Sequence, residues 1–199
     1  MIEPGYLHLL INHFPIVLGV VGTLGALVAL VMRRRSVWLF AVACLAIAGL
    51  FAQPVVMTGN IAEEIMRDAW YMSRAALDEH EASGEWARWA LLLSGAASAF
   101  AWWILVRTPR TTAQQRDGRT GDFPGWLQAL VVVTALLSTA ITARTAYLGG
   151  VLVHANATLA SPPLPSLPAT PVATPAPSGP PRTDSVVPQP VDTGRVAPR

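Results

Sequence analysis

Four histidines are the side chains of this 199-residue sequence best suited to chemistry. Imidazole binds haem iron, copper and zinc, and it can gain or lose a proton near neutral pH. His8 and His13 lie close to the start of the chain, His80 precedes a long apolar segment, and His154 follows another. Whether they can act together depends on the elements that position them.

Those elements are long apolar segments. Hydrophobic residues make up 52% of the chain and charged residues only 13%, whereas a soluble domain usually holds about 25% charged residues. A membrane core about 30 Å thick is crossed by about 20 apolar residues in a helix. Four segments meet this requirement, at about 7–32, 37–57, 86–106 and 126–153. The sequence therefore predicts an all-α membrane protein, a four-transmembrane-helix bundle within residues 1–157.

Two further segments differ from the four spans. The segment at about 60–72 carries apolar side chains at helical spacing opposite acidic ones, which predicts a short amphipathic helix lying on the outer membrane surface.

Twelve of the last 39 residues are proline, and such a composition buries too little apolar surface to form a core. Residues 158–199 are therefore predicted to be a disordered tail.

Arginines determine the predicted orientation. Short loops rich in arginine stay on the cytoplasmic side, and the first and third loops are rich in it, while the second loop is mainly acidic. Both termini are therefore predicted to lie outside the cytoplasm, in the periplasm if the cell has one, with the chain in the inner (cytoplasmic) membrane. The arginines of the two loops are Arg33, Arg34, Arg35, Arg107, Arg110, Arg116 and Arg119.

Counting residues along each helix places the histidines in one layer. At 1.5 Å per residue from the cytoplasmic end, His13 lies roughly 28 Å and His8 roughly 36 Å along the first helix. The same count gives roughly 39 Å for His80 and roughly 42 Å for His154. The hydrocarbon ends near about 30 Å, so all four histidines are predicted at the outer face.

The first helix carries a stripe of small and polar residues on one face. Small residues let helices approach closely in lipid, so this face, which includes His8, is predicted to pack inward. His13 is turned about 140° from His8, so it faces a second helix unless Pro15 bends the chain and re-aims it. The stripe comprises His8, Asn12, Pro15, Gly19, Gly22, Ala26 and Ala29. A similar stripe in the fourth helix, interpreted as helix packing, comprises Thr134, Ser138, Thr142, Thr145 and Gly149, with Gly150 beside it.

Arg144 is a charged residue within the fourth predicted span. It lies roughly 27 Å from the inner end of that helix, close enough to the outer surface for its side chain to reach water. A structural ion pair with Glu63 or Glu64 is therefore predicted.

Several short pieces, in this order, resemble a bacterial family of predicted membrane proteins known as domain of unknown function 2231. The pieces are Asn12–Ile16, Thr58-Gly59, Ala62–Glu64, His80-Glu81 and Leu148–Val153. The resemblance covers about residues 5–154 and implies a four-helix membrane domain. Some relatives are joined to Rieske iron–sulfur or cytochrome c modules, which implies a link to respiratory electron transfer. Relatives often have proline after the first histidine, where this chain has Leu9, so the resemblance favours His13 and His80 over His8.

Two functions fit these patterns. The first is a redox-associated module that binds haem b or a transition-metal ion through His13, His80 and His154, with Glu81 as a further metal ligand. Electron flow across the membrane through such a module would need an electron-transfer or periplasmic protein partner, because no histidine lies at the inner face. The alternative is a non-enzymatic scaffold or sensor whose proline-rich tail binds an extracytoplasmic partner, the histidines being interface residues or a pH switch.

Other classes are disfavoured. No serine or cysteine nucleophile lies at the outer face beside a histidine with an orienting acid, which argues against a hydrolytic enzyme. The net charge of +2 is too small to indicate a nucleic-acid partner. The lipid bilayer is the partner that the composition requires, and a homo-oligomer is compatible with it.

Overall fold

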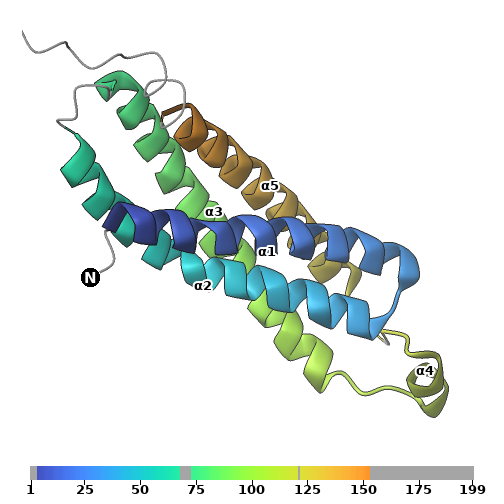
Figure 1. Cartoon of the computed structure of the whole chain (residues 1–199). Helices are drawn as coiled ribbons and strands as arrows, with labels where there is room; N and C mark the ends of the chain where they lie inside the picture. The colour runs from blue at the N-terminus through green and yellow to red at the C-terminus, as the bar shows by residue number, and fades with distance from the viewer. Residues whose placement is uncertain (1–3, 68–72, 121, 153–199) are drawn as a thin grey trace, which may run out of the picture. The chain divides into compact units, whose positions relative to one another are not determined.

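The computed structural model describes residues 4–67, 73–120 and 122–152. Within them the helices are α1 (Pro4–Met32), α2 (Arg35–Met66), α3 (Arg74–Arg107), α4 (Thr112–Asp117) and α5 (Gly125–Gly150) (Figure 1). All but α4 are long and apolar enough to cross a membrane. The predicted all-α fold with four membrane-spanning helices is confirmed, and the chain is a multi-pass membrane protein.

The chain divides after Pro162 into two units, and the first unit contains all of these helices. The second unit begins at Pro163 and lies outside the described residues. The predicted tail and His154 therefore also lie outside them.

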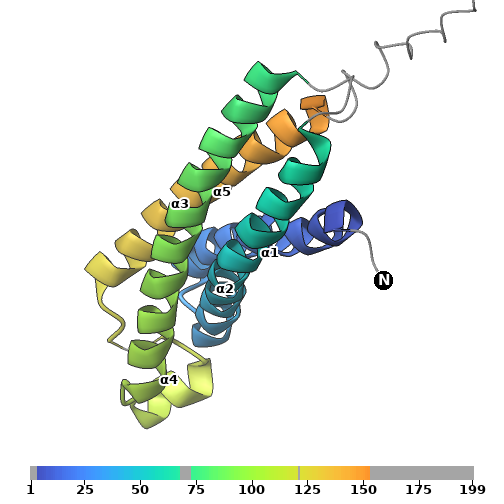
Figure 2. The ribbon, with the colours of Figure 1, turned by 90° about the vertical axis from the view of Figure 1, so that its left-hand side faces the viewer.

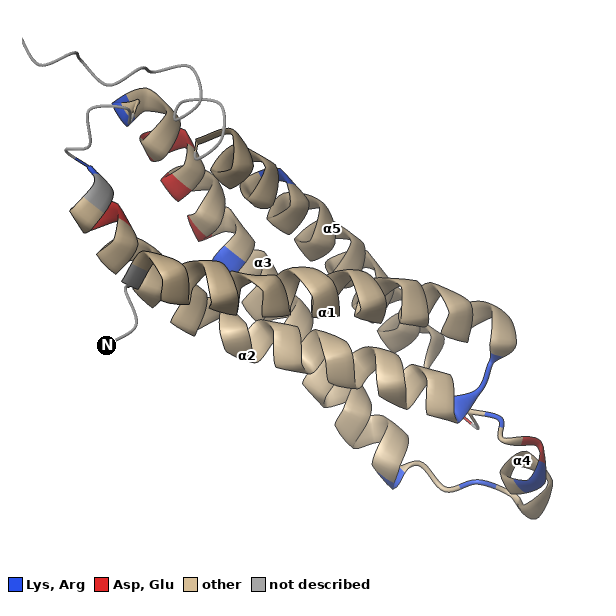
Figure 3. Ribbon diagram, viewed as in Figure 1, with Lys and Arg blue, Asp and Glu red and all other residues tan. Residues whose placement is uncertain are grey.

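The long helices alternate in direction and pack in a ring. Helix α1 packs mainly against α2 and α5, and α3 packs mainly against the same two helices (Figures 1 and 2). We call one end of this bundle the arginine end. It holds the α1–α2 turn, residues 108–124 and the ends of the helices that these two loops join. The opposite end, where His8 and His80 lie, is the histidine end. Figure 3 shows that the two arginine-rich loops, predicted on the same side of the membrane, lie at the same end of the bundle.

Two helices extend further at the histidine end than predicted. Helix α2 continues to Met66 instead of ending near residue 57, and α3 begins at Arg74 instead of near Trp86. The prediction of a separate surface helix at 60–72 is wrong, because residues 60–66 are the last turns of α2. Residues 68–72 lie outside the described part.

Helix α2 runs through Thr58-Gly59 without a break. The Thr58 hydroxyl donates back to the carbonyls of Pro54 and Val55, both at 3.0 Å, within the same helix. Further on, Glu63 pairs with Arg67 one turn later, a spacing that supports a helix. Pro54 lacks the N–H for one bond of this helix, and Figure 1 shows α2 bending so that its last turns lean towards the start of α3.

The largest apolar core lies at the arginine end. Trp38, which is 1% exposed, meets Phe123 edge to face with ring centroids 5.2 Å apart. Leu105 and Leu127 are fully buried in the same cluster. These residues come from α2, α3, α5 and the segment before α5, so a dense apolar plug closes this end of the bundle.

Helices α2 and α3 touch backbone to backbone at two glycines. A Cβ atom added to Gly49 would lie 2.8 Å from the Gly95 Cα and 2.9 Å from the Leu91 carbonyl oxygen. Neither position belongs to the predicted stripes, which lie on α1 and α5. The crossing of α2 and α3 thus depends on two residues that hydropathy did not distinguish.

Candidate functional site

His8 reaches from α1 to the last turns of α2. Its Nδ1 lies 3.1 Å from the Val55 carbonyl oxygen and 3.2 Å from the Thr58 hydroxyl. A carbonyl oxygen only accepts, so Nδ1 carries the proton and donates, which leaves Nε2 of the neutral ring with a free lone pair. The ring rests on Gly59, where an added Cβ would lie 3.0 Å from the His8 Cε1.

His80 makes the equivalent contact between α3 and α5. A Cβ added to Gly149 would lie 3.0 Å from the His80 Cε1, so this ring also rests directly on a helix backbone. Its Nδ1 is buried and has no hydrogen-bond partner within the described part of the chain. A buried polar atom without a partner is unfavourable and requires a ligand or water to satisfy it.

The two histidines form a repeated arrangement. Each lies near the start of the first helix of an antiparallel hairpin and packs on a glycine near the end of the second helix. Both rings lie at the histidine end, one on α1 and the other on α3. One turn beyond His8, the Asn12 Oδ1 is buried and has no partner among the described residues. Two imidazoles and an amide oxygen are therefore found at the same end of the bundle.

His13 is not part of this group. Its side chain is exposed, and its Nδ1 bonds to the Leu9 carbonyl of the same helix. Pro15, which is buried, does not re-aim it inward. His13 therefore does not face the bundle interior with His80, whereas His8, on the inward stripe, lies half-buried at the same end.

The predicted set of metal ligands does not assemble in the part of the chain that the structure describes. Glu81 is exposed, and His154 lies outside the described residues. Among those residues, no three His, Cys, Asp or Glu side chains come together as ligands would. What remains of the predicted set is His80, joined by His8.

The ion pair of Arg144 has a different partner from the predicted ones. Its Nη2 lies 2.9 Å from the Glu79 Oε1 on α3, whereas Glu63 pairs with Arg67 and Glu64 is exposed. The reason is the unexpected length of α3, which brings Glu79 level with Arg144 on α5. Both side chains are more than half exposed, so this pair stabilises the bundle little.

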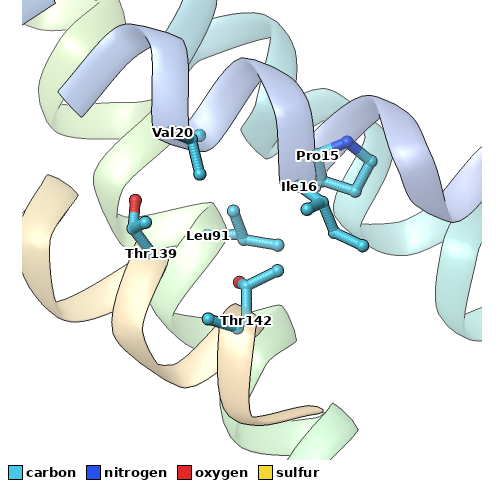
Figure 4. A pocket seen from close by; sticks show the side chains of 8 residues that line it. Pro15, Ile16, Val20, Leu91, Thr139 and Thr142 are labelled. Carbon is cyan, nitrogen blue, oxygen red and sulfur yellow. The ribbon is translucent and has the colours of Figure 1, made fainter. Parts of the chain in front are cut away.

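Below the histidines, hydroxyl side chains line the bundle interior. Ser83 and Thr145 lie 2.8 Å apart across α3 and α5, and Thr23 and Thr139 lie 2.8 Å apart across α1 and α5. A small cavity between α1, α3 and α5 adjoins them, and Figure 4 shows residues that line it. The stripes predicted on α1 and α5 do face inward; their buried members are Pro15, Gly19, Gly22, Ala26, Ala29, Thr134, Ser138 and Thr142.

Other hydroxyl groups inside the bundle are buried and have no hydrogen-bond partner among the described residues. Ser98 is 0% exposed and its Oγ has no partner among the described residues. Ser98→Ala should therefore leave the free energy of unfolding in micelles unchanged or raise it by about 1 kcal/mol. Thr23→Val is the matched contrast, since Thr23 bonds to Thr139 and to the Ala135 carbonyl, and it should lose about 1 kcal/mol. Equal losses in both variants would show that Ser98 does have a partner, such as a buried water.

In comparisons with known proteins, no family model, no curated protein and no solved structure matches the chain. What the site does is therefore inferred from its own residues.

Proposed function

We propose that this membrane protein binds a first-row transition-metal ion through His8 and His80, as a redox-associated module. The observation that supports this most directly is that two imidazoles, from the diagonal helices α1 and α3, lie at the same end of the bundle, each against a glycine. A metal-binding histidine typically donates one ring N–H to a carbonyl and offers the other nitrogen to the ion. The bond from His8 to Val55 prepares that state, and His80 presents a buried nitrogen without a partner.

A bare ion suits this packing better than haem does. Both rings lie directly against a helix backbone, so only the imidazoles separate the helices at these points. An ion needs room only at the ring nitrogens, whereas a porphyrin needs a much wider space between helices. Copper, zinc, nickel and iron all accept imidazole, and the Asn12 amide oxygen is available as a further donor.

The proposed orientation places the site outside the cytoplasm. Seven arginines of two short loops gather at the opposite end, and such loops stay cytoplasmic. We therefore propose an inner-membrane protein with both termini extracytoplasmic. Because the plug around Trp38 fills the arginine end, the ion or its electrons would pass to a protein partner on the histidine side.

Metal titration of the purified protein tests this proposal, with His13→Ala as the matched control. His13 is the same residue type on the same helix as His8, but it is exposed and bonds within α1. Metal-stripped protein in detergent should bind about one Cu²⁺ or Zn²⁺ per chain, and His8→Ala and His80→Ala should each weaken binding by at least about 10-fold. His13→Ala should bind as the unchanged chain does.

Two results would overturn the proposal. One is metal binding that depends on the wrong histidines: it persists in the double variant His8→Ala/His80→Ala, or it is lost in His13→Ala. The other is a Soret absorption band in the purified protein that disappears in the His8 and His80 variants, which would assign haem to the site instead.

A further inference from the structure

The two loops of the arginine end are joined into one surface. The Arg35 N–H donates to the Gly118 carbonyl and the Thr120 N–H to the Arg33 carbonyl, both at 3.1 Å. A β-bridge links Arg34 and Arg119 between them. Gly118 has a positive φ of 67° where α4 ends, a conformation that glycine adopts without strain. The backbone beneath these side chains is therefore held in place by hydrogen bonds.

The positive charge of this surface is not neutralised within the described part of the chain. Its seven arginines form no ion pair there, and the ion pairs that Arg67, Arg88 and Arg144 make lie towards the histidine end. The acidic residues of the two loops, Asp117 and Asp122, are both exposed. This end of the bundle therefore presents a positive surface that can attract an anion from outside the protein.

Arg35 and Arg110 differ from the other five arginines because they are half-buried, while the rest are exposed. The charge of Arg110 acts on the Arg35 guanidinium. The Arg35 Nη1 is shielded from solvent and meets no hydrogen-bond partner in the described residues. Two like charges repel more strongly as water is removed, so an anion bound by both groups would relieve this repulsion and would give the Arg35 Nη1 the acceptor it lacks.

Tryptophans show the depth at which this pair lies. Trp102, Trp103 and Trp126 are exposed at the arginine end, and Arg107 stacks on Trp103 at 4.8 Å from the ring centroid. Exposed tryptophans of membrane proteins collect at the level of the lipid headgroups. Arg35, the first residue of α2, lies at the same end of the bundle as these tryptophans, which in a membrane is the end near one layer of lipid phosphates.

We propose that Arg35 and Arg110 form a binding site for the phosphate of an anionic phospholipid. Guanidinium groups bind phosphate oxygens through paired N–H donors, and the unpartnered Arg35 Nη1 supplies one of them. The five exposed arginines attract anionic lipid diffusely but do not build the site. This proposal is independent of the metal site at the other end of the bundle.

Native mass spectrometry of the delipidated full-length protein, offered phosphatidylglycerol and phosphatidylcholine in equal amounts, tests it. The unchanged chain should retain one phosphatidylglycerol. Arg35→Gln and Arg110→Gln should each weaken that binding by at least about 10-fold, because hydrogen bonds to a charged group are lost. Arg116→Gln removes the same charge from exposed α4, and it should weaken binding by about 5-fold or less.

Other outcomes contradict the proposal. Equal weakening by Arg116→Gln and Arg35→Gln would mean diffuse attraction by the whole surface. Displacement of the lipid by millimolar inorganic phosphate would mean a site for free phosphate. Because Arg110 lies between helices α3 and α4, its variant keeps the test valid even if Arg35→Gln unfolds, and thermal unfolding in phosphatidylcholine micelles checks the fold of both.

Discussion

Trp38→Ala should lower the free energy of unfolding by about 3 kcal/mol, among the largest losses that one side chain of this protein can cause. Trp38 is 1% exposed and meets Phe123 at 5.2 Å between ring centroids, so its removal leaves a cavity in the apolar plug. The loss should be at the low end for a buried tryptophan, because an unfolded segment in lipid still lies among apolar groups. Reversible unfolding in mixed micelles, followed by fluorescence of the remaining tryptophans, measures it.

Trp126→Ala is the control for this experiment. Trp126 also lies at the arginine end, but it is 62% exposed, and its replacement should cost less than about 1 kcal/mol. If both variants lost the same free energy, the plug would contribute no more to stability than the membrane-facing surface does.

Gly95→Ala should lower the free energy of unfolding by about 2 kcal/mol. A Cβ at this position would lie 2.9 Å from the Gly49 Cα, and a backbone atom cannot move aside as a flexible side chain does. The added methyl group must therefore push α2 and α3 apart along their crossing. The same unfolding measurement detects the loss, and a disulfide between cysteines placed across the crossing would form more slowly.

Gly84→Ala is the matched control on the same helix. A Cβ there would lie 3.9 Å from the Thr145 Cγ2, an ordinary contact, so the change should stay within about 1 kcal/mol of the unchanged chain in either direction. A loss in Gly84→Ala as large as in Gly95→Ala would show that glycine matters throughout α3 for a reason other than close approach.

Much of the bundle could be predicted from local patterns. The four spans follow from hydropathy, since a helix in lipid must satisfy its own backbone and expose apolar side chains. The inward face of α1 follows from spacing, because small residues three and four apart share one side of a helix. The same arithmetic separated His8 from His13, and the structure places His8 inside and His13 outside.

The candidate site could be predicted only in part. Short pieces of resemblance favoured His13, but they carry no information on where the side chain points. The surface helix was expected as a separate element because the apolar span ends near residue 57; α2 instead continues to Met66, where the Glu63–Arg67 pair supports its last turn. The length of α3 then decided that Arg144 meets Glu79.

The histidines thus show where local information ends. The amino-acid sequence by itself determined four apolar helices, the arginine-rich loops and the end of the bundle at which His8 and His80 lie, because these depend on hydropathy, charge and a constant rise per residue. Only the tertiary structure decided which groups meet: His8 on Gly59, His80 on Gly149, and Gly49 against Gly95. Contacts between helices depend on the rotation of each helix about its axis, on the crossing angle and on the helix length. A change in any one of these brings different residues together.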